Sequence, residues 1–164
     1  MTVYQKFSKV NTLIFDVDGV FTNSDMQITE SGELLRSMST QDGYVVKKAI
    51  KAGLNIAIIT KGNSKGVTLR LQGLGVVDIY TNMPDKLVTF KEYCKMKDVK
   101  PKECLYVGDD NSDLIILNEV LLPCCPNDAV RDVLEVCEYI SPYKGGNGCV
   151  RDIIERVLRI NNLW

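Results

Sequence analysis

Short apolar runs rich in branched side chains alternate along this chain with longer segments of helical spacing. The apolar runs lie at residues 12–17, 54–60, 76–80, 104–107 and 121–125, and the helical segments at 42–53, 64–73, 85–97, 112–119 and 149–160. Apolar runs of this kind are typical of strands buried on both faces, and their alternation with helices predicts a parallel sheet covered on both sides. We therefore expect an α/β fold, a doubly wound parallel sheet, in one domain covering 1–164.

The stretch 21–40 interrupts this alternation. Its apolar residues flank a polar turn at 30–33 and are Met26, Ile28, Leu34 and Met38. Two short segments around such a turn predict a β-hairpin inserted after the first strand. Because an isolated hairpin is marginal in water, these side chains are expected to need a partner surface. Three smaller expectations are that Asp42 caps the next helix, that Asn127 or Asp128 caps a later one, and that 138–141 is an edge strand.

The composition excludes several classes of site. With no histidine, the chain cannot build a Ser–His–Asp or Cys–His nucleophile or an HExxH zinc site, so carboxylates, lysines or tyrosines must carry protons. The net charge of −1 gives no reason to expect nucleic acid or an anionic membrane as partner. No apolar run approaches the ~20 residues of a membrane span, and the N-terminal residues lack a signal-peptide core. We expect a cytoplasmic protein whose six cysteines are free thiols.

Polar residues that suit phosphate chemistry follow the predicted strands: Asp16 and Asp18, Thr60, Lys86 and Asp109. Ligands of such sheets bind at the carboxyl ends of the strands. One carboxylate and one backbone carbonyl from Asp16 and Asp18, with Asp109 opposite, would suit Mg²⁺, which prefers oxygen ligands. Lys86 could neutralise a phosphate dianion, and Thr60 could hold a phosphoryl oxygen. A calcium loop is excluded, because it needs glycine at its sixth position and glutamate at its twelfth.

Four ordered motifs resemble those of the haloacid dehalogenase superfamily: Asp16-Val17-Asp18-Gly19-Val20, Ile59-Thr60, Asp85-Lys86-Leu87 and Gly108-Asp109-Asp110-Asn111-Ser112-Asp113. The resemblance implies that Asp16 is the nucleophile, forming an aspartyl-phosphate, and that Asp18 is the general acid and base. It implies further that Thr60 and Lys86 bind the phosphoryl group, that Asp109 binds Mg²⁺, and that Asp110 and Asp113 support the metal ligands. A response-regulator receiver carries similar groups in a different chain order.

The stretch between Asp18 and Thr60 leaves no room for a separate cap domain. The chain thus resembles the capless branch typified by 3-deoxy-D-manno-octulosonate 8-phosphate phosphatases and nonulosonate 9-phosphate phosphatases. That resemblance implies a phosphorylated 3-deoxy-2-ulosonic acid as substrate, as in lipopolysaccharide biosynthesis, and a homotetramer in which paired hairpins let one subunit cover its neighbour's site. It also implies that the substrate is contacted by Asp18, Lys86, Asp42, Gly43 and Arg70. Residues 144–148 resemble the glycine-rich segment that this branch has near its C-terminus.

The sequence departs from this branch at positions that bear on specificity. It reads Thr60-Lys61-Gly62-Asn63 where relatives have Thr-Gly-Arg or Thr-Gly-Glu, and it has Lys47 where relatives can have arginine. Two alternatives therefore stay open. One is a phosphatase for another small phosphorylated metabolite. The other is a non-catalytic oligomerisation domain associated with a sugar-nucleotide synthetase, which would have no physical need for the five strand-end residues.

Overall fold

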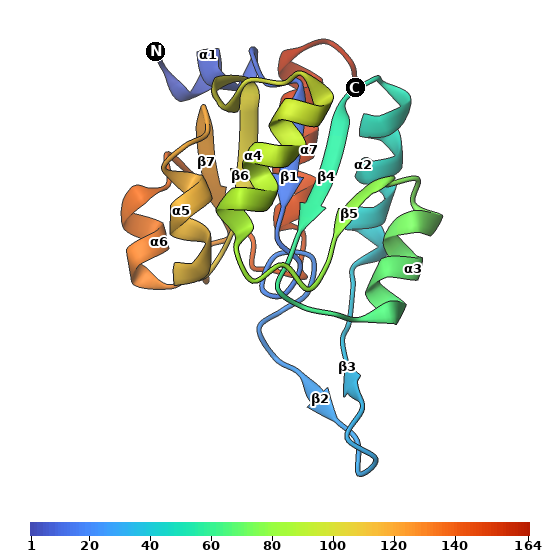
Figure 1. Ribbon diagram of the computed structural model, residues 1–164. Coiled ribbons are helices and arrows are strands. Elements are labelled where there is room, and N and C mark those ends of the chain that lie inside the picture. The colour runs from blue at the N-terminus through green and yellow to red at the C-terminus, as the bar shows by residue number, and fades with distance from the viewer.

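The centre of the protein is a six-stranded parallel sheet, seen in a computed structural model that describes all 164 residues (Figure 1). The strands run in the order β5-β4-β1-β6-β7-β8. Their bounds are Thr12–Phe15 (β1), Asn55–Ile59 (β4), Asp78–Tyr80 (β5), Cys104–Val107 (β6), Leu122–Cys125 (β7) and Tyr139–Ile140 (β8). The chain adds β4 and β5 on one side of β1 and later β6, β7 and β8 on the other, so the strand order reverses at β1.

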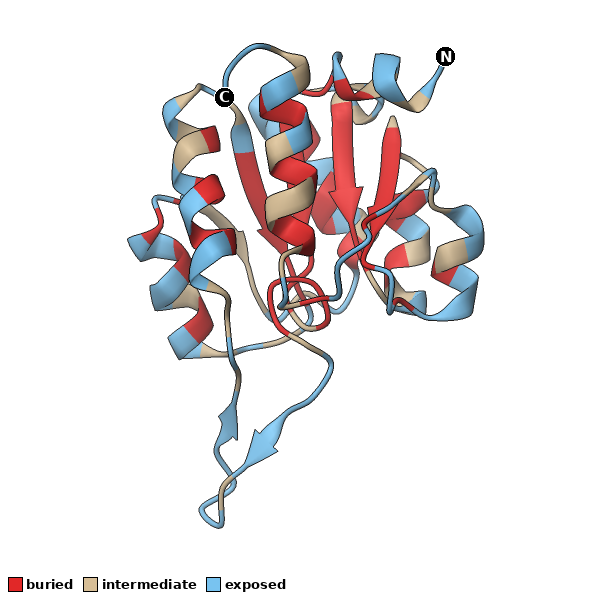
Figure 2. Cartoon of the chain, turned by 180° about the vertical axis from the view of Figure 1, so that it is seen from behind, coloured by how far each residue is buried: buried red, intermediate tan, exposed pale blue.

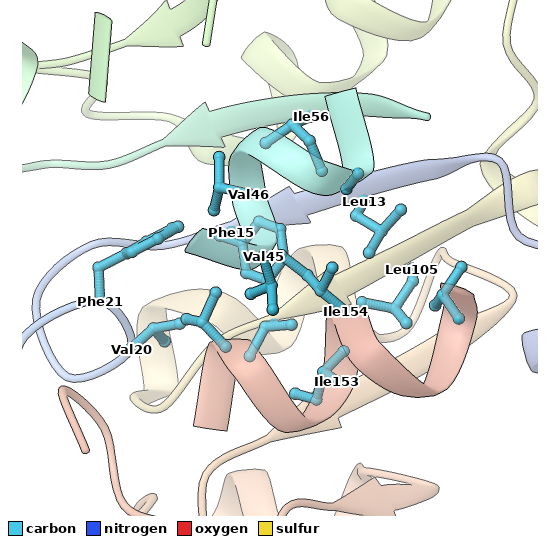
Figure 3. Packing of buried hydrophobic residues seen from close by; sticks show 14 of the residues in the cluster. Leu13, Phe15, Val20, Phe21, Val45, Val46, Ile56, Leu105, Ile153 and Ile154 are labelled. Carbon is cyan, nitrogen blue, oxygen red and sulfur yellow. The ribbon is translucent and has the colours of Figure 1, made fainter. Parts of the chain in front are cut away.

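Helices cover both faces of the sheet because successive side chains of a strand point to opposite sides. Leu13 and Phe15 of β1 enter one core, shared with α1, α2, α3 and α7, whereas Ile14 enters a second core shared with α4, α5 and α6. Figure 3 shows side chains of β1, α2 and α7 meeting in the larger core. The helices are α1 Val3–Phe7, α2 Thr40–Lys51, α3 Lys65–Gly73, α4 Lys86–Lys97, α5 Leu114–Leu117, α6 Arg131–Val136 and α7 Cys149–Ile160. This architecture confirms the predicted fold class.

The predicted hairpin is present and projects away from the sheet, at the end opposite the two termini (Figure 1). Its strands, β2 Gln27–Ile28 and β3 Leu34–Leu35, are antiparallel and very short. Their side chains are exposed, Ile28 by 72%, and both strands are pale blue in Figure 2. In a single chain the hairpin therefore leaves much of its apolar surface exposed.

Some details of the elements differ from expectation. The hairpin-proximal helix α2 begins after Ser39, whose Oγ accepts the N–H groups of Gln41 and Asp42, so the predicted cap by Asp42 is wrong. The predicted cap of α6 by Asn127 or Asp128 is also wrong, because the N-cap residue is Val130 and α6 has no side-chain cap. The Asp128 carboxylate instead accepts the N–H of Gly145. The segment 112–119 is a 3₁₀ turn, Asn111–Asp113, followed by α5. The short helix α1 was not predicted.

Two further properties of the chain are visible in the structure. All six cysteines are free, and all but the half-buried Cys137 are buried, as expected. None of the helices combines the length and the apolar character that crossing a bilayer would require.

The glycine-rich loop before α7 packs directly against the loop that follows β1. A Cβ on Gly145 would overlap the backbone carbonyl of Gly19, and Gly146 lies against Thr22 and Asn23. The N–H of Gly146 also donates to the carbonyl of Val20, 2.9 Å away. The chain's last glycine-rich segment therefore holds its first strand-end loop in place.

We predict that Gly145→Ala lowers the free energy of unfolding by about 1–3 kcal/mol, since the added methyl has to displace backbone. Chemical denaturation measures this. Gly73→Ala is the matched control, because nothing lies within 4 Å of a Cβ there, and alanine is the better helix former. Equal stability of the Gly145→Ala variant and the wild type would contradict the packing described.

A second prediction concerns Asp42, which is 1% exposed in the first turn of α2. Its Oδ1 accepts the N–H of Arg151 on α7, 2.9 Å away, while its Oδ2 has no partner. Burial raises the pKa of Asp42 from 3.8 to about 6, against the opposing effect of the backbone hydrogen bonds. The native protein therefore keeps this proton to higher pH than the unfolded chain, and stability attributable to Asp42 falls as the pH rises from about 4 to about 6.

Asp42→Asn should remove this pH dependence. The shift is about two pKa units, so the variant should gain at most about 3 kcal/mol over the wild type between pH 4 and pH 7. Urea denaturation across that range measures the difference. Asp98→Asn, at an exposed position with φ of 54° that asparagine tolerates, is the control. Parallel pH profiles for Asp42→Asn and the wild type would contradict the prediction.

Candidate active site

The strand ends around β1 bring the predicted polar residues into one cleft. Asp16 and Asp18 follow β1, Thr60 follows β4, Lys86 begins α4, and Asp109 follows β6. The cleft has a volume of about 290 Å³ and is lined by Asp16, Asp18, Gly19, Ser24, Thr60, Lys61, Gly62, Lys86, Asp109, Asp110 and Ser112. It opens beside β1, where the strand order reverses, which is the place where ligands of open α/β sheets bind.

Lys86 is buried between two carboxylates. Its Nζ lies 2.8 Å from Asp16 Oδ2 and 2.7 Å from Asp113 Oδ1, and its side chain is 1% exposed. Asp85 positions the lysine, because it caps α4 by accepting the N–H groups of Leu87 and Val88. The second oxygen of Asp16, Oδ1, accepts the N–H of Val17 at 2.7 Å. Both oxygens of Asp16 are thus oriented by the chain.

Asp113 is a buried carboxylate that orients its neighbours in the site through several hydrogen bonds. It is fully buried, and besides Lys86 its Oδ1 accepts the hydroxyl of Tyr106 at 2.6 Å. Its Oδ2 accepts the N–H groups of Asp109 and Asp110, at 3.1 and 3.2 Å. Asp113 therefore fixes both Lys86 and the backbone that carries Asp109. Sequence reasoning missed Tyr106, which lies inside an apolar strand and reads there as an ordinary core residue.

The acidic groups of the cleft are held close together in spite of their like charges. One oxygen each from Asp16, Asp109 and Asp113 lie within 4.8 Å of one another. Burial, reinforced by Asp113 and opposed by Lys86, raises the pKa of Asp16 to about 6. Burial, with the charges of Asp16, Asp113 and Asp110, raises that of Asp109 to about 8. Burial disfavours the charge on Lys86, but Asp16 and Asp113 outweigh this and raise its pKa above the ordinary value.

These features fit a hard dication. Asp109 Oδ1 is buried without any hydrogen-bond partner, although buried polar atoms are normally paired. Gly19, with φ of +87°, leaves the space that the Asp109 carboxylate occupies, since a Cβ there would overlap it. Carboxylate oxygens are the ligands that Mg²⁺ prefers. The donor set of Asp16 and Asp109 therefore suits the predicted metal.

Asp18 and Thr60 lie at the mouth of the cleft. Thr60 is 3% exposed, and its hydroxyl oxygen accepts the N–H of Gly62 at 3.1 Å. The Asp18 carboxylate, at 37% side-chain exposure, is bound by Arg36 from the base of the hairpin. Sequence reasoning missed Arg36, because nothing in the spacing of 18 and 36 indicates that the hairpin folds back.

Three of the residues predicted to contact the substrate, Asp42, Gly43 and Arg70, do not line this cleft. Asp42 is buried against α7. Arg70 is exposed on α3 and lines a separate groove between that helix and the hairpin. Gly43 lies under the Arg70 guanidinium, since a Cβ on it would stand 2.7 Å from Nη2. Gly43 and Arg70 thus form one surface outside the cleft of their own chain.

Comparisons with known proteins agree with the geometry. Residues 58–153 match the haloacid dehalogenase-like hydrolase family. A 3-deoxy-D-manno-octulosonate 8-phosphate phosphatase of Yersinia pestis is 31% identical over 156 residues, or 95% of this chain and 83% of that protein. A crystal structure of this phosphatase from Y. pestis matches with a TM-score of 0.95 at 31% identity, covering 98% of this chain and 86% of that one.

A second solved structure is similar over almost the whole chain. It is the 3-deoxy-D-manno-octulosonate 8-phosphate phosphatase of Moraxella catarrhalis, in complex with a magnesium ion, a phosphate ion and a KDO molecule. It matches with a TM-score of 0.93 at 29% identity, covering 97% of this chain and 91% of that one. This chain belongs to the haloacid dehalogenase-like hydrolases, in the branch without a separate cap domain, and is a phosphoric monoester hydrolase.

Proposed function

We propose that the chain hydrolyses the phosphate monoester of a 3-deoxy-2-ulosonic acid, such as 3-deoxy-D-manno-octulosonate 8-phosphate, with Mg²⁺ and through an aspartyl-phosphate. The observation that carries the proposal is the Asp16 carboxylate, held 2.8 Å from the buried Lys86 Nζ and close to Asp109, in a chain without histidine. The substrate class is supported by the relatives, which are phosphatases of this sugar acid.

In the proposed reaction an Asp16 oxygen attacks phosphorus while the bond to the sugar oxygen breaks, which splits one difficult displacement into two easier steps. Asp18 gives its proton to the leaving oxygen, then takes one from the water that hydrolyses the aspartyl-phosphate. Lys86 and the Thr60 hydroxyl bind phosphoryl oxygens. The buried ammonium suits this role, because charge stabilisation is strongest where water is excluded.

Mg²⁺ would be held by the carboxylates of Asp16 and Asp109 and the backbone carbonyl of Asp18. When bound, the ion supplies positive charge that lets a dianionic phosphate approach a carboxylate. Asp113 would support this set by fixing the backbone of Asp109, and Asp110 by its position beside it. A non-catalytic scaffold would need neither this cluster nor a buried lysine.

Recognition of the sugar acid is proposed to involve a second subunit. The cleft itself is open, and only Lys61 adds an exposed cation to it beyond the phosphate site. Arg70 and Gly43 lie outside it, in or beside the groove next to the hairpin. We propose a homotetramer, working in the cytoplasm, in which the exposed hairpin is buried. In it, Arg70 and Lys47 serve a neighbour's cleft, while the buried Asp42 and Gly43 support their surface from beneath.

Asp16→Asn tests the mechanism. Since an amide cannot act as the nucleophile, we expect kcat for 4-nitrophenyl phosphate to fall at least about a thousandfold, with the melting temperature retained. Asp98→Asn is the control with the same chemical change at an exposed site. Removal of Mg²⁺ with a chelator should abolish wild-type turnover, and returning the ion should restore it. Full activity of Asp16→Asn would refute the aspartyl-phosphate.

A substrate panel with Mg²⁺ tests the specificity. We expect kcat/KM to be about ten- to a hundredfold higher for phosphorylated ulosonic acids than for neutral sugar phosphates, since a charge-assisted contact to the carboxylate is worth roughly 1.5–3 kcal/mol. Arg70→Ala should reduce this preference but leave hydrolysis of an aryl phosphate intact. Light scattering on the same sample reports the assembly, and a monomer would contradict the shared site. A preference for neutral sugar phosphates would contradict the proposed substrate class, but not the phosphatase activity.

A further inference from the structure

Arg36 joins the base of the hairpin to the Asp18 carboxylate. Its Nε donates to Asp18 Oδ1 at 2.6 Å and its Nη2 to Oδ2 at 3.3 Å. Its Nη1 donates to the carbonyl of Leu34, 3.1 Å away in β3. The Arg36 side chain is only 9% exposed. A guanidinium buried to this degree, with three donors engaged, holds its partner in a defined orientation.

The position of Arg36 separates it from the phosphate-binding groups. It does not line the cleft that contains Asp16, Lys86 and Asp109. Instead it lies in a small hollow beside that cleft, with Thr60 and Gly62. A Cβ on Gly62 would stand 3.1 Å from Asp18 Oδ2 and 4.0 Å from Arg36 Nη2. Arg36 thus contacts Asp18 from this hollow and not from within the cleft.

Asp18 depends on this contact for its orientation. Within the chain, Arg36 provides the only hydrogen bonds to the Asp18 carboxylate. Asp16 and Asp113, in contrast, are each held by two or more partners. The shorter contact is on Oδ1, so Oδ2, which lies beside Gly62 in the wall of the cleft, is the less engaged oxygen.

We propose that Arg36 is the positioning residue for Asp18. Through Arg36, the hairpin controls the orientation of the carboxylate that transfers the proton. The inference rests on the proposed function, because it takes Asp18 as the acid and base. Arg36 holds Oδ1 and leaves Oδ2 to carry the proton, which passes to the ester oxygen as its bond to phosphorus breaks. In the second half-reaction a water proton returns to Oδ2 while the water oxygen bonds to phosphorus and the bond to Asp16 breaks. The orientation of the hairpin thereby sets the orientation of Asp18.

Arg36→Ala is tested with two esters that differ in their need for a proton. Glycerol phosphate has a basic leaving oxygen and no carboxylate, whereas 4-nitrophenyl phosphate leaves readily without protonation. Values of kcat/KM report the first half-reaction for both. We expect Arg36→Ala to lose about ten- to a hundredfold on glycerol phosphate, as for a misplaced catalytic group, and less than about threefold on the aryl ester. Arg36→Lys, which keeps the charge but not the paired donors, should recover part of the loss.

A double-mutant cycle separates positioning from a structural role. If Arg36 acts through Asp18, adding Arg36→Ala to Asp18→Asn should change kcat/KM on the aryl ester and on glycerol phosphate by less than about twofold. Arg131→Ala, whose side chain is 88% exposed on α6, is the control and should match the wild type. Equal losses on both esters, or the same loss with and without Asp18, would overturn the positioning role. A wild type that hydrolyses neither these esters nor a phosphorylated ulosonic acid would instead refute the proposed function.

Discussion

The ion pairs of Lys86 are the interaction on which the rest of the site depends. A lysine that is 1% exposed stays charged only because Asp16 and Asp113 lie within 2.8 Å of its Nζ. Removing both partners would leave the ammonium unpaired in the interior, which costs about 3–5 kcal/mol, whereas removing one leaves it paired with the other. The same contacts join the end of β1, the start of α4 and the turn after β6. Stability of the sheet edge and orientation of Asp16, the proposed nucleophile, therefore have one physical source.

The charge of this cluster explains why a dication and a phosphate suit it together. Three carboxylates and one ammonium leave two negative charges, which one dication balances. Without such an ion, burial and the charges of Asp16, Asp113 and Asp110 raise the pKa of Asp109 to about 8. Once the ion is present, Lys86 and the positive charge beside Asp109 make the mouth of the cleft attractive to an anion. A carboxylate nucleophile can then meet a phosphate dianion without prohibitive repulsion.

The parts of this site that the sequence predicted are those governed by local pattern. Strand–helix alternation places Asp16, Thr60 and Asp109 at one sheet edge, whatever the remaining contacts are. Tyr106 and Arg36 escaped prediction because their roles depend on partners distant in space or in sequence. The N-cap of α2 was predicted at the wrong residue for a related reason, because Ser39 and Asp42 both suit the start of a helix. Only the packing of α2 against α7, where Asp42 accepts the N–H of Arg151, decides between them.

The hairpin connects the assembly of subunits with the geometry of the active site. Near its tip, Ile28 and Leu34 are exposed by 72% and 48%, and at its base Arg36 binds the Asp18 carboxylate. A two-stranded ribbon with two residues in each strand cannot keep its own direction in water. Its orientation must be set by whatever covers its apolar side chains, and Arg36 passes that orientation to the carboxylate. In an enzyme without a cap domain, burial of the hairpin between subunits would thus do two tasks at once: close the open cleft and align the group that moves the proton.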